Sequence, residues 1–426
     1  MVASFSSLAL TQVLPFLPLA QGDIDYQTER RSNPNLIAEV LGQPGTTVVF
    51  VRDGLVAVPD GQAARVDYET AKIRLAGVPG EYVLRALAGE SGGELDGSPR
   101  PTNESSSKGN YQDDYESVNQ IAGKLGLIPM FLGSYGVGSD HPQAVVALDV
   151  SGFANGVGAD VANGKSDITA ETVDEGRESV TGGGARETTE KNTERRPGSA
   201  SIPNNKPMQN HVLERALERF DWVSLLGFAP HASARETGQA TTAVALSNWH
   251  ANQKYCPCCG SPVRLAMSGW AQQCGNERCK VHHSLLFPRI EPAVITSIVD
   301  GQDRLLLQHN KAWANPGLYS VCAGFVEAGE NLEHACRREA SEEDGLDLGE
   351  IKYLGSQPWP FPASLMVAFK ARALSIDVDV DRSETVDARF FTRDEFADAL
   401  TKGQVVQPGK ATIARYMIEE WYGQKL

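Results

Sequence analysis

The order of hydrophobic and polar positions predicts strands and helices in turn along the chain. Short runs of β-branched and other apolar residues bounded by turn residues predict strands, which we expect at 48–51, 55–58, 82–88, 144–150, 293–299, 304–308 and 318–326. Apolar residues at helical spacing, or stretches rich in helix formers, predict helices, which we expect at 35–41, 212–222, 241–250 and 332–344. The pattern therefore predicts a mixed α/β protein with a β-rich N-terminal part.

Two polar stretches interrupt this pattern. Residues 96–117 are rich in Pro, Ser and Asn, and residues 155–210 are rich in Gly, Thr, Glu and Asn with almost no large apolar residue. Neither stretch can bury enough apolar surface to offset the entropy of ordering it. We expect flexible insertions, and the second is more typical of a solvated linker than of a recognition motif.

The length of 426 residues predicts about three domains. We place an N-terminal β-rich domain at 1–248 with insertions near 96–117 and 155–210, a small cysteine-containing unit at 249–289, and an α/β domain at 290–426. The formal net charge of −15 argues against a broad basic surface for nucleic acid.

The distribution of apolar residues and cysteines bears on the compartment. The apolar run at 14–20 contains two prolines, follows no basic region and is too short to span a bilayer. All seven cysteines lie between residues 256 and 336, which is typical of metal binding in a reducing compartment rather than of a disulfide framework. We expect a cytoplasmic protein that does not bind membranes.

Four of these cysteines have the spacing of a structural zinc site. Cys256 and Cys259 lie in CPCCG, and Cys274 and Cys279 follow after a 14-residue gap. Tetrahedral Zn²⁺ is commonly held by four thiolates from two such turns, which makes a zinc ribbon without an open position for chemistry.

The second pair of cysteines departs from the usual CxxC spacing. Other ligands are therefore open, namely Cys258, His282 or His283, and a degenerate site without metal is a further alternative. A ribbon that reads nucleic acid is disfavoured, because few basic residues lie here.

The stretch 332–344 concentrates carboxylates on a predicted helix. Glu339, Glu342 and Glu343 stand at i, i+3 and i+4, which places them on one face, about 5–6 Å apart. Arg338 can pair with Glu342, but we expect no Lys or Arg to answer Glu339 or Glu343. A hard divalent cation would relieve the repulsion. A solvated acidic face is the alternative interpretation.

Residues 356–366 read SQPWPFPASLM, with three prolines and two aromatic residues in seven positions. Such a segment cannot be a regular helix or a central strand, and it presents rigid rings in fixed directions. The alternative is a proline-stiffened loop that only packs on the core.

Together these motifs resemble a known family. Residues 324–346 resemble the Nudix box GX5EX7REUXEEXGU, with Ala340 and Leu346 in the apolar positions. The fixed residues of the box are Gly324, Glu330, Arg338, Glu339, Glu342, Glu343 and Gly345. With SQPWPFPxSLM after the box, and a cysteine ribbon and Phe287-Pro288-Arg289 before it, the chain resembles the NADH pyrophosphatase branch of the Nudix hydrolases, some members of which remove NAD caps from RNA.

The resemblance implies a fold and a metal site. It implies a C-terminal α/β/α sandwich with a mixed sheet and an N-terminal domain similar to a rudimentary Nudix unit. Arg338 would orient the glutamates, and Glu330 would support the loop. Two or three Mg²⁺ or Mn²⁺ ions would be bound by Glu339, Glu342, Glu343, Glu384 and the backbone carbonyl of Ala323.

The resemblance also implies a dinucleotide site. Phe325 and Phe287 match positions that stack on the base, and Phe287 would reach across a homodimer. The segment 357–364 and one further residue would line the site: Gln357, Pro358, Trp359, Pro360, Phe361, Pro362, Ala363, Ser364 and Ala414.

The implied reaction is the hydrolysis of NAD(H) to nicotinamide mononucleotide and AMP, with the removal of NAD caps from RNA 5′ ends as a further activity. Glu343 or Glu342 would accept the proton of water. Alternative substrates are ADP-ribose and dinucleoside polyphosphates, and a non-catalytic nucleotide sensor is the alternative from another class. We expect Cys322 and Cys336 to be buried apolar side chains rather than nucleophiles.

Overall fold

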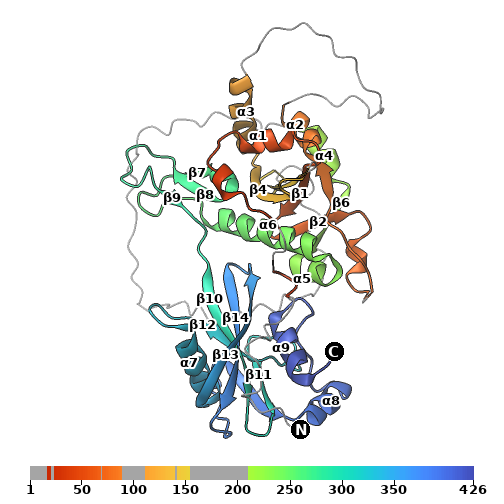
Figure 1. Cartoon of the computed structure of the whole chain (residues 1–426), viewed down its shortest axis with the longest axis vertical. Helices are drawn as coiled ribbons and strands as arrows, with labels where there is room; N and C mark the ends of the chain where they lie inside the picture. Colours follow the sequence, from red (N-terminus) through yellow and green to blue (C-terminus); the bar gives the residue numbers. More distant parts are fainter. Residues whose placement is uncertain (1–16, 21–23, 69, 89–110, 140–141, 154–209) are drawn as a thin grey trace, which may run out of the picture.

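The computed structural model describes residues 17–20, 24–68, 70–88, 111–139, 142–153 and 210–426, and for 111–117 the backbone alone. Figure 1 shows two lobes, with the C-terminal sheet in one and the N-terminal sheet in the other. Most of the two expected insertions lies outside the described residues. The first is shorter than expected, because helix α3 (Tyr111–Lys124) begins inside it. Its C-terminal half packs Val118 and Ala122 against the core of the N-terminal lobe.

The N-terminal lobe is built on a six-stranded mixed sheet. Its strands are β1 (Thr47–Arg52), β2 (Leu55–Pro59), β3 (Gly77–Pro79), β4 (Ile128–Tyr135), β5 (Gln143–Asp149) and β6 (Phe220–Ser224). Their order is β4-β5-β1-β2-β6, with β3 paired to β1. Only the β1–β5 pair is parallel. The predicted strands at 48–51, 55–58 and 144–150 are confirmed.

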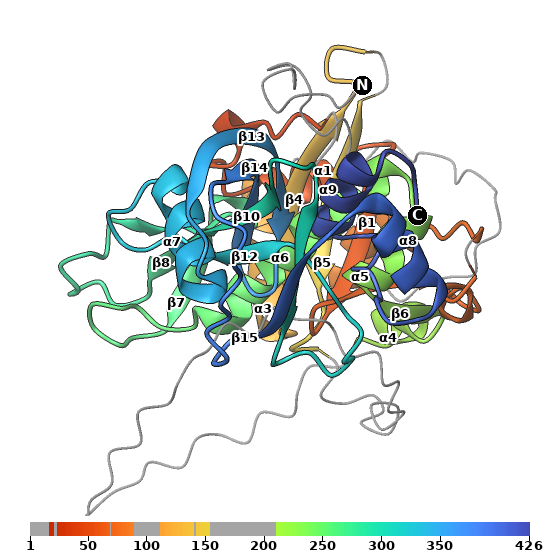
Figure 2. The same cartoon turned by 90° about the horizontal axis from the view of Figure 1, so that it is seen from below.

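The C-terminal lobe is built on a second six-stranded sheet with the same strand order. Its strands are β10 (Glu291–Val299), β11 (Leu305–Asn310), β12 (Cys322–Phe325), β13 (Leu348–Trp359), β14 (Ser364–Ala373) and β15 (Thr385–Phe391). The order is β13-β14-β10-β11-β15, with β12 paired to β10, and only β10–β14 is parallel. Helix α7 (Leu332–Asp344) covers one face, and α8 (Arg393–Thr401) and α9 (Ile413–Tyr422) cover the other, as Figures 1 and 2 show.

The two sheets therefore agree strand by strand in order and direction, which confirms the expected likeness of the two lobes. The difference lies in the helix that follows the third strand. In the C-terminal lobe this helix is α7, which carries the glutamates of the box. In the N-terminal lobe it is α2 (Gly80–Leu87), which has eight residues and Glu81 as its single carboxylate. The N-terminal lobe thus keeps the architecture without the acidic helix.

A small three-stranded sheet connects the lobes in sequence. It contains β7 (Val263–Ala266), β8 (Ala271–Cys274) and β9 (Leu285–Leu286), in that order. It follows the long helix α6 (Ala234–Asn252), which confirms and extends the helix predicted at 241–250. In Figure 1, α6 runs between the two large sheets.

One hydrophobic cluster extends through both lobes. It joins Val49 and Met130 of the N-terminal sheet, Ala243 of α6, and Ile295 and Trp421 of the C-terminal lobe. The lobes are therefore packed on a shared core, with α6 as the layer between them. A separate cluster lies on the outer side of the N-terminal sheet under α1 (Leu36–Leu41), which confirms the helix predicted there.

Two sequence predictions are wrong. Residues 82–88 belong to helix α2 rather than to a strand, because Val83 and Leu87, four residues apart, are buried on one side. Residues 212–222 are not one helix: α4 (His211–Leu217) ends and Phe220 begins strand β6. Pairing with β2 decides the conformation of 220–222 over their helical spacing.

The remaining helices are short. They are α5 (Leu225–Phe228) and the 3₁₀ turns Thr28–Arg30, Ala63–Arg65, Ala229–His231 and Met267–Gly269. Within the described residues, every helix is too short or too polar to cross a bilayer.

Candidate active site and cysteine cluster

Helix α7 has the bounds that the sequence predicted. The Asn331 side chain accepts a hydrogen bond from the His334 backbone N–H and caps the N-terminus. Gly345 ends the helix at φ 68°, in the left-handed conformation that favours glycine. The acidic helix is thus fixed at both ends.

The three glutamates of α7 differ in exposure. Glu339 and Glu343 are buried, with 9% and 5% of their surface exposed, whereas the Glu342 side chain is 61% exposed. The three carboxylates that the sequence predicts for one face of the helix therefore differ in their environment. The Glu339 and Glu343 side chains point into the protein, and the Glu342 side chain lies at its surface.

Arg338 connects the box loop with the helix. Its Nε and Nη2 donate to the two carboxylate oxygens of Glu330 at 3.0 and 2.9 Å, and Nη2 also donates to the Phe325 carbonyl at 2.7 Å. Hydrogen bonds from Arg338, together with one from the Glu327 backbone N–H, lower the pKa of Glu330 to about 2. The ion pair holds the loop between β12 and α7 in place.

Arg338 also contacts two glutamates of the helix. Its Nη1 donates to Glu339 Oε1 at 2.7 Å and to Glu342 Oε2 at 2.9 Å. The pairing with Glu342 is confirmed, but the expectation that no cation answers Glu339 is wrong. Side chains of residues next to each other in sequence usually point apart on a helix. Arg338 and Glu339 nevertheless contact each other, because the guanidinium has several donors and can reach more than one carboxylate.

Glu343 is held from the opposite side. Gln308 Nε2 donates to Glu343 Oε2 at 2.7 Å, and the Cys322 thiol lies 3.5 Å from the same oxygen. Burial raises the pKa of Glu343 to about 8 and raises the pKa of Glu339, whose neighbours Glu342 and Glu384 add to the effect. Within the described residues, no Lys or Arg pairs with Glu343, so a bound divalent cation fits this side chain.

The other two candidate metal ligands lie on neighbouring strands. Ala323 is on β12 and pairs with Ile295 of β10. Glu384 is exposed and directly precedes β15. Its charge raises the pKa of Glu339, which places it across from α7. The structure therefore brings carboxylates from α7 and the β15 edge toward the end of β12, while their role as ligands stays a prediction.

A cavity of about 80 Å³ has Gln308, the hydrogen-bond partner of Glu343, in its lining. Of the predicted site residues, it is lined by Ala323, Trp359 and Ala414. Residues that the sequence did not indicate also line it: Ile295, Gln308, Asn310, Trp313, Leu318, Ser320, Val321, Met366, Pro408, Thr412 and Ile413. Most of its lining is apolar, which suits a flat ring.

The start of the segment 357–364 is fixed by backbone contacts. Gln357 is fully buried, and its amide bonds to the Ala411 carbonyl at 3.0 Å and the Ile413 N–H at 2.8 Å, so its polar atoms hold the wall of the cavity rather than face it. Pro358 lies in β13, which is an edge strand, as its missing N–H requires.

Further along this segment, Asn248 of α6 donates to the Pro360 carbonyl at 2.8 Å. Trp359 and Phe361 pack edge to face with ring centroids 5.1 Å apart. The Glu291 N–H bonds to the Ala363 carbonyl at 3.0 Å, and Ser364 opens β14. Pro362 is exposed. Residues 358 and 360–364 do not line the cavity.

The two predicted stacking aromatics lie apart. Phe325 is half-buried on β12 and pairs with Ala293. Phe287 lies between β9 and β10 with 49% of its surface exposed and lines no part of the cavity. Cys322 and Cys336 are both buried, and burial raises the pKa of both thiols, which does not suit nucleophiles.

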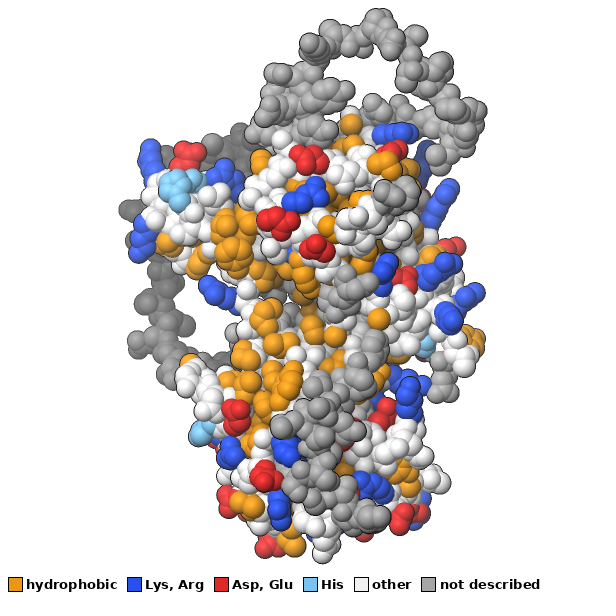
Figure 3. All heavy atoms as spheres, viewed as in Figure 1, with side chains coloured by type: hydrophobic (Ala, Val, Ile, Leu, Met, Phe, Trp, Pro, Cys, Tyr) orange, Lys and Arg blue, Asp and Glu red, His pale blue; other side chains and the backbone are white. Residues whose placement is uncertain are grey.

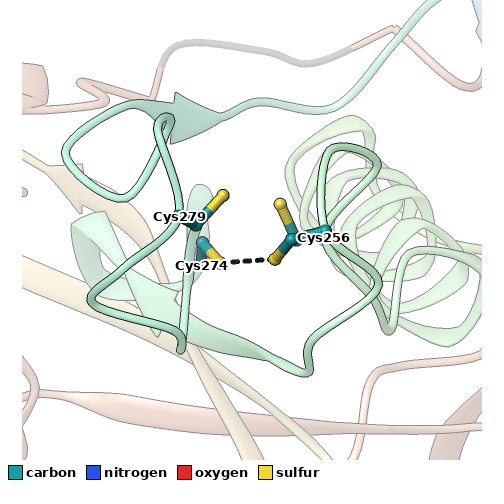
Figure 4. Close-up of side chains that lie close together, drawn as sticks. Cys256, Cys274 and Cys279 are labelled. Carbon is teal, nitrogen blue, oxygen red and sulfur yellow. Dashed lines mark hydrogen bonds between the residues drawn. The ribbon is translucent and has the colours of Figure 1, made fainter.

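The cysteine cluster is assembled as the spacing predicted. The sulfur atoms of Cys256, Cys259, Cys274 and Cys279 all lie within 4.8 Å of one another. Figure 4 shows the sulfur atoms of Cys256, Cys274 and Cys279 turned toward a shared space. Cys258 is exposed and outside the group.

Neither histidine near the cluster belongs to it. The His282 ring bonds to the Cys274 carbonyl at 3.0 Å and packs against His283. Four sulfurs from two turns fit tetrahedral Zn²⁺, and hydrogen bonds from Ser261 already lower the pKa of the Cys259 thiol to about 6.

Comparison with known proteins finds a family model and relatives that match part of the chain. Residues 289–411 match the NUDIX domain. The NAD-capped RNA hydrolase NUDT12 of Homo sapiens is 38% identical over 196 residues, covering 44% of this chain and 42% of that protein. The NAD-capped RNA hydrolase NudC of Mycobacterium bovis is 42% identical over 214 residues, covering 47% of this chain and 64% of that protein.

A solved NUDIX hydrolase structure from Nitrosomonas europaea is 23% identical with a TM-score of 0.31, covering 41% of this chain and 95% of that one. The matched part spans less than two thirds of the curated relatives named above. Residues 289–411 of this chain are thus similar to the NUDIX domain, and the chain is similar over somewhat less than half its length to curated NAD-capped RNA hydrolases.

Proposed function

We propose that this protein hydrolyses the pyrophosphate bond of NAD(H) in a metal-dependent reaction, giving nicotinamide mononucleotide and AMP, and that it removes NAD caps from RNA by the same cleavage. One observation carries the proposal: Gln308 donates a hydrogen bond to the buried Glu343 of α7 and also lines an apolar cavity that contains Trp359 of the SQPWPFP segment. The names of the relatives support NAD as the common part of the substrate.

The acidic residues have distinct roles in this proposal. Glu339, Glu342, Glu343, Glu384 and the Ala323 carbonyl hold two or three Mg²⁺ or Mn²⁺ ions, which neutralise the pyrophosphate and activate water when bound. Arg338 fixes the Glu339 and Glu342 carboxylates through its Nη1 bonds. Glu343 accepts the proton of the attacking water, and Gln308 holds its Oε2 in place.

The cavity binds one ring of the dinucleotide. Trp359, Met366 and Ile413 provide its apolar walls, and Asn310 and Thr412 provide polar atoms that orient a base. Phe325 and the segment 357–364 extend the site around it. The pyrophosphate then lies toward the α7 carboxylates, because Ala323 and Gln308 are at that side of the cavity.

The four-cysteine cluster binds a structural zinc ion. Its four thiolates leave no position for a substrate, so the ion stabilises the turns that precede β10. The proposed domain limits are those predicted from the sequence: 1–248, the ribbon at 249–289 and the NUDIX domain at 290–426. A cytoplasmic location agrees with reduced cysteines.

A homodimer completes the site in this proposal. Phe287 and Ile290, on the connection from the ribbon to β10, are 49% and 57% exposed. On the face drawn in Figure 3, hydrophobic side chains gather between the two lobes, as expected for a surface that a second copy covers. Sedimentation of wild type and of Phe287→Asp tests this directly, because a dimer through this surface should dissociate in the variant.

The substrate is tested by comparing kcat/KM for NADH, NAD-capped RNA, ADP-ribose and a dinucleoside polyphosphate, each with Mn²⁺. The proposal predicts that both NAD-containing substrates are preferred and that Trp359→Ala lowers kcat/KM for NADH by about tenfold or more, the value of roughly 1.4 kcal/mol of lost ring contact. A preference for ADP-ribose would support the alternative NUDIX hydrolase. Binding of NAD(H) without turnover would support the nucleotide sensor.

A further inference from the structure

A second group of possible metal ligands lies behind the acidic helix. The Cys322 sulfur and one carboxylate oxygen each of Glu343 and Asp344 all lie within 4.8 Å of one another. All three residues are buried, with 1%, 5% and 0% of their surface exposed. We call these three residues the thiol–carboxylate cluster. It joins strand β12 to the last turn of α7.

The cluster contains side-chain atoms without partners. Both carboxylate oxygens of Asp344 are buried and accept no hydrogen bond, although a fully buried carboxylate usually accepts several. The Gln308 Oε1 atom is likewise buried and unpaired, while the Nε2 of the same amide bonds to Glu343 Oε2. Three buried acceptor oxygens, two on Asp344 and one on Gln308, are therefore without a donor among the described residues.

We propose that the thiol–carboxylate cluster binds a thiophilic divalent cation such as Zn²⁺. One thiolate and two carboxylates give three ligands, and Gln308 Oε1 can supply a fourth oxygen after rotation of its amide. Mg²⁺ prefers oxygen ligands and binds thiolates poorly, whereas Zn²⁺ binds thiolate and carboxylate ligands together. Zinc bonds of about 2.0–2.3 Å require the ligands to close by about 1 Å from their present separation, which side-chain rotation can supply.

The ion can reach this cluster from the cavity. Gln308, Ser320 and Val321 line the cavity wall, and Cys322, the first residue of β12, directly follows Val321. Gln308 bonds both Glu343 and Thr385 and so separates the cavity from the cluster. Movement of this one side chain opens the path.

Binding here would oppose hydrolysis. This consequence rests on the proposed function, in which Glu343 holds Mg²⁺ or Mn²⁺ and accepts a proton. A Zn²⁺ ion bound to Cys322 and Asp344 would draw Glu343 away from that role, so the two kinds of metal would compete for a single carboxylate. The cluster would therefore make the enzyme sensitive to thiophilic metals through a ligand set of its own.

Cobalt(II) binding tests the site without substrate. The intact protein is loaded with one equivalent of Zn²⁺, which the four ribbon cysteines should take, and is then titrated with Co²⁺ while the sulfur-to-cobalt charge-transfer absorption is followed. We expect a band in wild type and in Cys336→Ser, a matched control because Cys336 is buried but outside the cluster. In Cys322→Ser the band should vanish, and in Asp344→Asn the Co²⁺ affinity should fall at least about tenfold.

Loss of the band in Cys322→Ser and weaker binding by Asp344→Asn, with unchanged circular dichroism, would support the site. An equal band in Cys322→Ser, or no band in wild type, would overturn it, whether or not the protein hydrolyses NADH. If hydrolysis is present, the Zn²⁺ concentration for half inhibition, relative to each variant's own rate, should rise at least about tenfold in Cys322→Ser. An unchanged value would overturn the competition between the metals.

Discussion

Gly324 lies directly against the Glu339 carboxylate: a Cβ atom at residue 324 would come within 2.1 Å of the Glu339 carboxyl carbon and 2.2 Å of its Oε1. Two non-bonded heavy atoms cannot come this close. Residue 324 of β12 must therefore be a glycine, because the Glu339 carboxylate packs directly on it. Arg338 fixes that carboxylate from the other side at 2.7 Å. The position of Glu339 is thus set by a backbone without a side chain and by one guanidinium.

Gly324→Ala should move Glu339 by about 1 Å and lower kcat by on the order of 100-fold, because a displacement of this size is enough to disturb catalytic geometry. Steady-state hydrolysis with varied Mn²⁺ measures both the rate and the metal dependence. Gly301→Ala is the matched control, since a Cβ there meets nothing within 4 Å. Wild-type kinetics in Gly324→Ala would show that Glu339 does not need its present position.

The buried Glu343 should make the stability of the protein depend on pH when no Mg²⁺ or Mn²⁺ is added. Its pKa is about 8 in the folded protein against an ordinary 4.5, so the folded state keeps a proton that the unfolded state loses. The stabilisation is fully present below pH 4.5 and disappears as the pH rises toward 8. We expect the free energy of unfolding to fall by a few kcal/mol, on the order of 1.4 kcal/mol per pKa unit at most.

Urea unfolding at pH 5 and pH 8 measures this effect. Glu343→Gln should reduce the difference between the two pH values, while Glu333→Gln, an exposed change on the same helix, should leave it unchanged. Asp344, whose pKa burial raises to about 7, contributes in the same direction. A protein that is more stable at pH 8 than at pH 5 would contradict the assignment.

The cysteine cluster should hold one zinc ion per chain. Cys279→Ser removes a ligand and should lower the zinc content by one ion per chain and lower the unfolding temperature, because metal binding contributes to folding. Cys258→Ser is the matched control, as this cysteine is exposed and outside the cluster. Metal analysis after dialysis distinguishes the variants. Full zinc content in Cys279→Ser would point to His282 or His283 as a ligand instead.

Asn248 should position the substrate segment from the N-terminal lobe. Its side chain holds the Pro360 carbonyl at 2.8 Å, next to Trp359 of the cavity. Asn248→Ala should raise KM for NADH about tenfold with a small effect on kcat, since the loss of this partly buried hydrogen bond costs roughly 1–1.5 kcal/mol. Asn252→Ala, an exposed change in the last turn of the same helix, is the control. An equal KM for NADH in Asn248→Ala and Asn252→Ala would show that Asn248 does not position the substrate segment.

The acidic helix was predictable to the residue because its signals are local. Gly329 and Gly345 bound a stretch of helix formers without Pro or Gly, and the α7 bounds agree with that expectation. Residues 82–88 were not predictable in the same way. Their short apolar run, interrupted by Arg85, suits a strand equally well, and only burial of Val83 and Leu87 on one side decides for a helix.

The cavity was only partly predictable for a different reason. Trp359 and Ala414 came from a family motif, whereas Trp313 and Thr412 lie on connecting segments that the fold alone brings together. The bonds from Gln357 to Ala411 and Ile413 also join segments more than 50 residues apart. Contacts between residues this far apart in the sequence leave no local pattern from which they could be predicted.

The proposed function requires that this site cleave the pyrophosphate bond of NADH. The most direct measurement is chromatography of the products after incubation with NADH and Mn²⁺, with wild type beside Glu343→Gln. We predict reduced nicotinamide mononucleotide and AMP in equal amounts from wild type, and a rate at least about 100-fold lower from Glu343→Gln. Intact NADH with wild type, or equal product formation by Glu343→Gln, would contradict the account.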